Sequence, residues 1–302
     1  MLGEVAVRYP ALIDTFEEAG AVLGLDLWQL VCRGPAETLA RTELTQPLVL
    51  TGSVALWRVW CSMSDLRPAL LAGHSLGEYS ALVAAGSLQF PDAVRITAAR
   101  GRLMQAAVPE GQGAMAAILG LADETVEAIC REVAEQQVVA AANYNSPGQV
   151  VIAGESAAVE RAIRACQDAG ARRAVKLPVS VPSHCRLMAP AAESLRAELE
   201  DVAIEPPRIP LIHNADLERH QSIDQIRMSL VAQLCSPVRW TAVVRQMSLS
   251  GVSIVAECGP GRVLTALGRR IEREQEWLAL DAPDGMDTLQ EALRREMNHH
   301  HD

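Results

Sequence analysis

Aromatic residues are scarce in this chain of 302 residues, and its cysteines never form a C-x-x-C pair. Aromatic side chains make up 3% of the sequence and hydrophobic residues 49%, so the core must be aliphatic and rich in alanine. Scattered cysteines, odd in number, predict reduced thiols in a cytosolic protein and argue against a disulfide framework or a zinc site. The seven are Cys32, Cys61, Cys130, Cys166, Cys185, Cys235 and Cys258.

The chain also lacks an excess of positive charge and a long hydrophobic run. Its net charge is −10 at pH 7, which argues against a general nucleic-acid binder, whose surface is basic. The longest stretch without charge, residues 136–154, is interrupted by Asn, Ser, Pro and Gln, whereas a membrane helix needs about 20 mostly apolar residues. No apolar segment typical of a signal peptide follows Met1. We expect a soluble, cytoplasmic protein that binds neither nucleic acid nor membrane.

Amphipathic helical patterns alternate with short apolar runs, which predicts an α/β fold. Between residues 112 and 178 the expected order is strand, helix, strand, strand, helix, strand, the ferredoxin-like arrangement. Residues 143–148 are expected to form a loop between the two middle strands. We therefore predict a discontinuous core of residues 1–111 and 179–302, hydrolase-like with a mainly parallel sheet, and an inserted ferredoxin-like subdomain at 112–178.

The strongest chemical signal is the G-x-S-x-G motif Gly73-His-Ser75-Leu-Gly77, which lies between an apolar strand and a helix. A serine in this sharp turn projects its hydroxyl, and both glycines are expected to remove side chains that would clash with the tight backbone. The N–H of Leu76, at the start of the helix, is expected to donate to a developing oxyanion. The alternative is a structural turn, because a bare G-x-S-x-G also occurs by chance.

A nucleophilic serine needs a base, which is usually histidine. His184 lies in PVSVPSHC, where two prolines stiffen an extended loop, and it is the leading candidate. His213, within an expected strand, is typical of a core histidine, and His220 of a surface one. His74 is expected to point away from Ser75. If a histidine is the base, activity should fall as the pH drops through the imidazole pKa.

Six blocks in the same order resemble the malonyl-CoA:acyl-carrier-protein transacylase family of bacterial fatty-acid synthesis, which is related to the acyltransferase domains of polyketide synthases. They are GHSLGEYSALVAAG from Gly73, ARGRLMQAAVPEGQGAMAAILGL from Ala99, NYNSPGQVVIAG from Asn143, LPVSVPSHCRLM from Leu177, QLCSPVRW from Gln233 and ECGPGRVLTAL from Glu257. The resemblance implies that Ser75 is acylated and that His184 is its base. It also implies that the backbone carbonyl of Gln233 accepts from the imidazole, which makes a Ser-His dyad without an acidic third member.

The resemblance assigns Arg100 as the partner of the malonyl carboxylate. A guanidinium binds a carboxylate through two parallel N–H bonds, which a neutral acyl group cannot accept in the same way. The residues alone do not distinguish Arg95, Arg100 and Arg102 as the partner of the carboxylate. The alternative for each arginine is a position on a solvated helix face.

Weaker correspondences concern the coenzyme A arm. The resemblance implies contacts from Gln46, Asn145, Gln149, Arg172 and Arg173. Turn propensity is the alternative for Asn145, and a solvated surface for the two arginines. The positive charge of Arg172 and Arg173 is also expected to attract an acidic carrier protein.

The implied reaction is ping-pong transfer of a malonyl group from coenzyme A to the phosphopantetheine thiol of holo acyl carrier protein, through malonyl-Ser75. No metal and no cofactor is expected, and the histidine-rich tail at 299–301 is more typical of a frayed terminus than of a metal site. One alternative is a serine hydrolase or thioesterase. One form of this alternative is a Ser-Asp enzyme, in which Asp284 would be the partner of the serine. Another is an inactive remnant that still binds carrier protein. The choice between malonyl and methylmalonyl, and between fatty-acid and polyketide synthesis, stays open.

One part of the family pattern is missing from this sequence. The family begins with a buried strand and the loop Phe-Pro-Gly-Gln-Gly-Ser-Gln, whose glutamine supplies a second oxyanion N–H. This chain instead starts within what resembles the family's first helical region. Two alternatives stay open: the start was assigned to an internal methionine, or the protein lacks half of the oxyanion hole. A parallel sheet is buried on both faces, so we expect a trough in the core, with lower stability and activity than in a form that contains the strand and loop.

Overall fold

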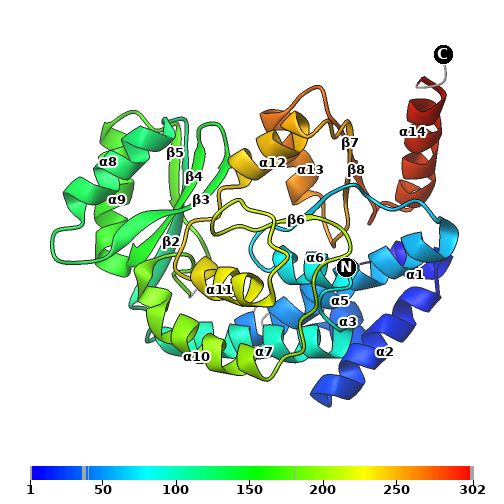
Figure 1. The fold of residues 1–302 in the computed structure, drawn as a ribbon. Helices are drawn as coiled ribbons and strands as arrows, with labels where there is room; N and C mark the ends of the chain where they lie inside the picture. The colour runs from blue at the N-terminus through cyan, green and yellow to red at the C-terminus, as the bar shows by residue number, and fades with distance from the viewer. Residues whose placement is uncertain (1, 36–38, 40, 180, 300–302) are drawn as a thin grey trace.

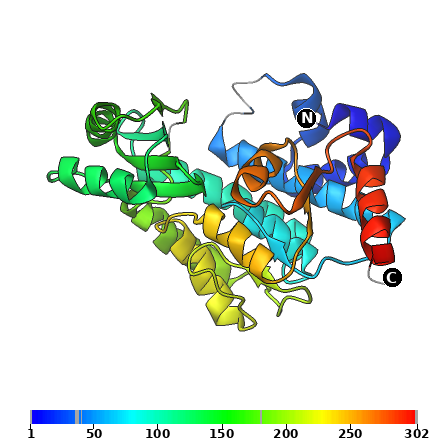
Figure 2. The ribbon, with the colours of Figure 1, turned by 90° about the horizontal axis from the view of Figure 1, so that it is seen from above.

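The computed structural model describes residues 2–35, 39, 41–179 and 181–299. Helices from the first third of the chain form one side of the molecule (Figures 1 and 2). They are α1 (Gly3–Arg8), α2 (Ala11–Leu23), α3 (Leu27–Arg33), α5 (Thr42–Met63), α6 (Gly77–Ala84) and α7 (Phe90–Ala107). As the composition predicts, their packing surfaces are mainly aliphatic.

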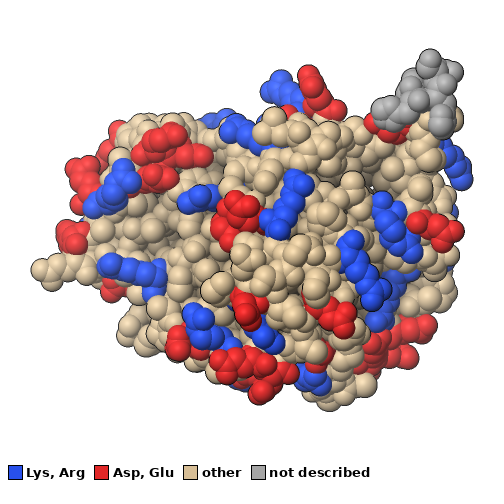
Figure 3. All heavy atoms as spheres, viewed as in Figure 1, with Lys and Arg blue, Asp and Glu red and all other residues tan. Residues whose placement is uncertain are grey.

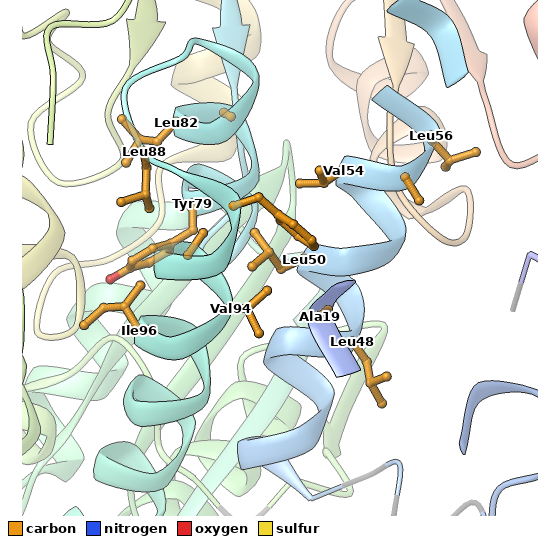
Figure 4. Packing of buried hydrophobic residues seen from close by; sticks show 14 of the residues in the cluster. Ala19, Leu48, Leu50, Val54, Leu56, Tyr79, Leu82, Leu88, Val94 and Ile96 are labelled. Carbon is orange, nitrogen blue, oxygen red and sulfur yellow. The ribbon is translucent and has the colours of Figure 1, made fainter. Parts of the chain in front are cut away.

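Helix α5 is the centre of this layer. It is apolar on nearly all sides, and a helix of this kind is stable only when other elements cover it. Helices α2, α6 and α7 pack around it. Figure 4 shows Leu50 and Val54 on the side of α5 that faces α6 and α7, with Val94 of α7 between the helices and Tyr79 of α6 beside Ile96. This packing fixes α6, and therefore the turn that precedes it.

The strands of the core form two short parallel pairs in the part of the chain that the structure describes. Strand β1 (Leu71–Ala72) pairs with β6 (Leu211–Ile212), and β7 (Ile254–Glu257) pairs with β8 (Glu276–Ala279). The parallel direction agrees with the prediction. An apolar cavity of about 640 Å³ is lined by residues of both β1 and β7 together with Trp57.

The second half of the core contributes helices on both sides of these strands (Figure 1). They are η1 (Arg186–Met188), α10 (Ala189–Glu200), α11 (Ile223–Gln233), α12 (Trp240–Leu249), α13 (Val263–Ile271) and α14 (Gly285–His299). Helices α12 and α14 and strand β8 are additions that the sequence patterns did not predict.

The inserted region contains β2 (Gly113–Leu119), α8 (Asp123–Val133), β3 (Val139–Ser146), β4 (Gln149–Glu155), α9 (Ser156–Asp168) and β5 (Arg173–Lys176). Its antiparallel sheet has the order β3-β4-β2-β5, with α8 and α9 packed on one face (Figure 1). This is the ferredoxin-like topology. The boundaries at 112 and 178 stay a prediction.

The expected loop over residues 143–148 is wrong. Strand β3 continues to Ser146, and only Pro147 and Gly148 form the turn. Asn143 and Tyr144 pair with β4 across two register shifts, and such bulges admit polar residues that resemble a loop in sequence.

All seven cysteines are free, as predicted. Within the described ranges, no helix has the length and apolarity that crossing a membrane requires. Acidic and basic side chains are mixed over the face shown in Figure 3, and no continuous basic surface is visible there.

Candidate active site

The G-x-S-x-G motif forms the turn between β1 and α6. Ser75 has φ 52°, a left-handed conformation that is strained for a side chain other than glycine. A Cβ added at Gly73 would lie 1.9 Å from the backbone carbon of Gly77, so the first glycine is required. A Cβ at Gly77 would meet nothing within 4 Å. The expectation that both glycines relieve a clash is therefore right for Gly73 and wrong for Gly77.

Ser75 and His184 are in direct contact. The Ser75 hydroxyl lies 2.8 Å from Nε2 of His184, and Nδ1–H of the same imidazole donates to the backbone carbonyl of Gln233 at 2.9 Å. The carbonyl leaves Nε2 as the acceptor of the serine proton. His184 also has a positive φ, 62°, so both members of the dyad sit in a strained backbone conformation.

The environment of His184 keeps its imidazole neutral. Burial, and after it the positive charge of Arg100, lower the pKa of His184 to about 3. A neutral imidazole is the form that takes a proton, so the base is ready throughout the neutral range. For the free enzyme we therefore expect the loss of activity below pH 5, at a lower pH than the ordinary imidazole pKa predicts.

Arg100 of α7 is buried beside the nucleophile, with 2% of its surface exposed. Its Nη2 donates to Ser75 Oγ at 3.2 Å and to Gln233 Oε1 at 2.9 Å. The alternatives Arg95 and Arg102 are both exposed, and they form surface ion pairs with acidic side chains. Among the three arginines that the sequence left open, the structure places Arg100 at the serine.

Two side chains that support the elbow were missed from the sequence. Strand β6 pairs with β1 in parallel, with Ala72 opposite Ile212, so the residues after both strands emerge at the same edge. There Asn214 Oδ1 accepts the Ser75 N–H at 2.7 Å, and Asn214 Nδ2 donates to the Gly73 carbonyl at 2.7 Å. A polar residue directly after an expected parallel strand was the available signal.

The second missed side chain is the carboxylate of Glu78, three residues after the nucleophile. Glu78 is fully buried and contacts His213, Asn214 and Gln233. Its position in the first turn of α6 resembles an ordinary acidic helix start, which gave no reason to single it out.

The backbone geometry around Leu76 suits the predicted oxyanion donor. The first hydrogen bonds of the turn run from the N–H groups of Gly77 and Glu78 to the carbonyls of His74 and Ser75. The N–H of Leu76 precedes them, at the positive end of α6.

The five residues expected along the coenzyme A arm lie in different places. Gln46 is buried and accepts from Arg100 Nη1 at 2.7 Å, which puts it at the guanidinium. Asn145 Oδ1 lies 2.9 Å from His74 Nε2, which joins His74 to the inserted region. Gln149 accepts from Arg270 at 3.1 Å. Arg172 and Arg173 are exposed.

The remaining candidates lie outside the dyad. His213 is a buried core histidine, as predicted. His220 is half-buried, and its Nε2 lies 2.7 Å from Asp216 Oδ2. Asp284 is exposed at the start of α14, where its backbone carbonyl accepts from Thr288. Within the described ranges no group of three or more His, Cys, Asp and Glu residues forms a metal site; tail residues 300–302 lie outside those ranges.

Comparison with known proteins gives a consistent answer. A family model described as acyl transferase domain matches residues 7–293. The malonyl CoA-acyl carrier protein transacylase of Escherichia coli strain K12 is 54% identical over 286 residues, which cover 95% of this chain and 93% of that protein. The crystal structure of malonyl-CoA:acyl carrier protein transacylase from Xanthomonas oryzae pv. oryzae superposes with a TM-score of 0.95 at 47% identity, over 97% of this chain and 93% of that one.

A further solved structure is similar over the same length. It is a malonyl-transacylase in complex with a type II PKS acyl-carrier protein, with a TM-score of 0.94 at 51% identity, over 95% of this chain and 93% of that one. A family model that spans nearly the whole chain, together with relatives at half identity, establishes the membership. This chain belongs to the acyl transferase domain family, in the group of the malonyl-CoA:acyl-carrier-protein transacylases.

Proposed function

We propose that this protein transfers a malonyl group from coenzyme A to the phosphopantetheine thiol of holo acyl carrier protein through a malonyl ester on Ser75. One observation carries the proposal. A single oxygen, Ser75 Oγ, lies within hydrogen-bond distance of both the His184 imidazole and the Arg100 guanidinium. The names of the similar proteins agree with this substrate pair.

In the first half-reaction, His184 Nε2 takes the hydroxyl proton while Ser75 Oγ attacks the thioester carbonyl carbon. Negative charge collects on the carbonyl oxygen, where the Leu76 N–H donates to it. The C–S bond then breaks, the coenzyme A sulfur leaves with the proton from His184, and malonyl-Ser75 remains.

In the second half-reaction, His184 takes the thiol proton of the phosphopantetheine arm. The sulfur attacks the ester carbonyl, the bond to Ser75 Oγ breaks, and His184 returns the proton to the serine. The carbonyl of Gln233 stabilises the imidazolium in both halves through Nδ1–H. The dyad thus needs no acidic third residue.

Arg100 selects the acyl group. In the free enzyme its Nη2 donates to the serine oxygen, and in the acylated enzyme the malonyl carboxylate takes this contact in a buried setting, where charge-assisted bonds are strong. Methylmalonyl carries the same carboxylate, so Arg100 selects carboxylated acyl groups over acetyl.

The carrier arm enters from the side of the inserted region. Asn145 of the inserted region contacts His74, the residue before Ser75 in the turn. The other candidate contacts of coenzyme A are Gln149 and the exposed Arg172 and Arg173. Exposed arginines also attract an acidic carrier protein. Seven free cysteines support a cytoplasmic location.

The experiment is an acyl-transfer assay with malonyl-CoA, with and without holo acyl carrier protein. We expect malonyl-carrier protein to form much faster than free malonate. Faster release of malonate to water would favour the serine hydrolase, and binding of carrier protein without any transfer would favour an inactive remnant.

A further inference from the structure

The carboxylate of Glu78 has no role in the steps above, yet it is fully buried next to them. Three donors converge on it. His213 Nδ1 lies 2.6 Å from Oε1, while the Asn214 N–H and Gln233 Nε2 lie 3.0 and 2.7 Å from Oε2. A buried carboxylate is costly unless donors satisfy it, so this side chain is kept in place by a complete set of partners.

The contact with Glu78 fixes the orientation of the Gln233 amide. An amide has a donor end and an acceptor end, whereas an ionised carboxylate only accepts. Gln233 Nε2 donates to Glu78 Oε2 and to the Ser75 carbonyl at 3.1 Å, so Oε1 faces the other way, where it accepts from Arg100 Nη2. A rotated amide would set acceptor against acceptor at Glu78 and Ser75, and donor against donor at Arg100.

The Arg100 guanidinium depends on that orientation. Its Nη1 is bound by the Gln46 amide and its Nη2 by the Gln233 amide, and Nη2 also reaches Ser75 Oγ. Its Nε has no hydrogen-bond partner among the described residues. Two amide oxygens thus set the direction of the guanidinium, and one of them is set by Glu78.

We propose that Glu78 is a specificity-determining positioning residue, which aims Arg100 at the carboxylate of the malonyl group by holding the Gln233 amide in one orientation. This inference rests on the proposed function. Its chemical consequence is selective, since an acetyl group makes no contact with Arg100 and does not depend on the aim of the guanidinium.

The test is a double-mutant cycle on acyl selectivity. Glu78→Gln keeps the side-chain volume but lets either end of its own amide face Gln233. Gln233→Met removes the amide while keeping the backbone carbonyl that binds His184. The quantity measured is the ratio of kcat/KM for malonyl-CoA to that for acetyl-CoA, with the melting temperature measured in parallel.

We expect each variant to lower this ratio at least about tenfold, as for the loss of one hydrogen bond to a charged group. The change should come through a higher KM for malonyl-CoA. Because Glu78 acts through Gln233, the double variant should lose no more than either single variant. A matched variant, His213→Asn, alters the donor on the other carboxylate oxygen and should leave the ratio within about twofold.

Equal losses for malonyl and acetyl, or losses that multiply in the double variant, would overturn the role of Glu78. If Glu78→Gln does not fold, Glu78→Asp takes its place, with an intermediate ratio expected and an unchanged ratio counting against the inference. A wild-type protein that forms no malonyl-Ser75 would instead overturn the proposed function. The two failures are therefore distinguishable.

Discussion

The two sides of the Ser75 turn differ sharply. On one side, His184, Arg100, Gln233 and Asn214 surround the serine with hydrogen bonds of 2.7 to 3.2 Å. On the other side, the turn borders the apolar cavity of about 640 Å³ between β1 and β7, where an added Cβ at Gly77 would touch nothing. The nucleophile, its base and the carboxylate partner are thus preorganised, while the opposite wall is open.

This comparison separates two requirements of an acyl-transfer site. Buried polar networks are worth most when every member is satisfied. On the side of Ser75 that carries the proton transfer and the acyl selectivity, both ring nitrogens of His184 and both terminal nitrogens of Arg100 are paired, while Arg100 Nε has no partner among the described residues. The other side is an apolar cavity whose lining includes Gly77. Variants that act on each side should therefore have distinct signatures.

On the ordered side, Arg100→Ala should act mainly on acyl selectivity. Arg100→Ala removes a buried charge-assisted pair, which costs about 2–5 kcal/mol, from the malonyl complex alone. The ratio of kcat/KM for malonyl-CoA to that for acetyl-CoA should fall by at least about thirtyfold, with acetyl transfer retained. The control is Arg102→Ala, an exposed arginine paired with Glu198, and a larger change there would move the carboxylate partner to the surface.

His184→Ala should slow acylation by about 10²-fold or more, because a general base contributes about this factor to the rate. In the wild type, burial lowers the pKa of His184 to about 3, so the base stays unprotonated as the pH falls from 8 to 5. We expect kcat/KM to show no acidic limb in that window and to decline only at lower pH. A decline centred near pH 6.5 would show that the imidazole is far better solvated than the structure indicates.

The smallest effects distinguish the two glycines of the motif. Gly73→Ala forces a Cβ into the backbone of Gly77 and should lower the free energy of unfolding by about 2–4 kcal/mol. Gly77→Ala points into open space and should change it by no more than about 0.5 kcal/mol. Urea unfolding measures both, and similar losses in the two variants would contradict the asymmetry of the turn.

Local patterns were sufficient to predict the alternation of strands and helices, the ferredoxin-like order and the serine turn, because each depends on residues close together in the chain. The choice of Arg100 over its helix neighbours was not available from spacing, since it depends on which face of α7 meets α5 and α6. Asn214 and Glu78 were missed for a similar reason: their roles arise only when β6 pairs beside β1 and brings the two strand ends together.

One oxygen, Ser75 Oγ, receives the acyl group in the proposed reaction, and intact mass spectrometry with peptide mapping tests this directly. After brief incubation with malonyl-CoA, we expect a single malonyl group on Ser75, which disappears when holo acyl carrier protein is added and never forms in Ser75→Ala. Malonylation of a different residue in that variant, or a malonyl-Ser75 that carrier protein cannot discharge, would show that Ser75 does not carry the transfer.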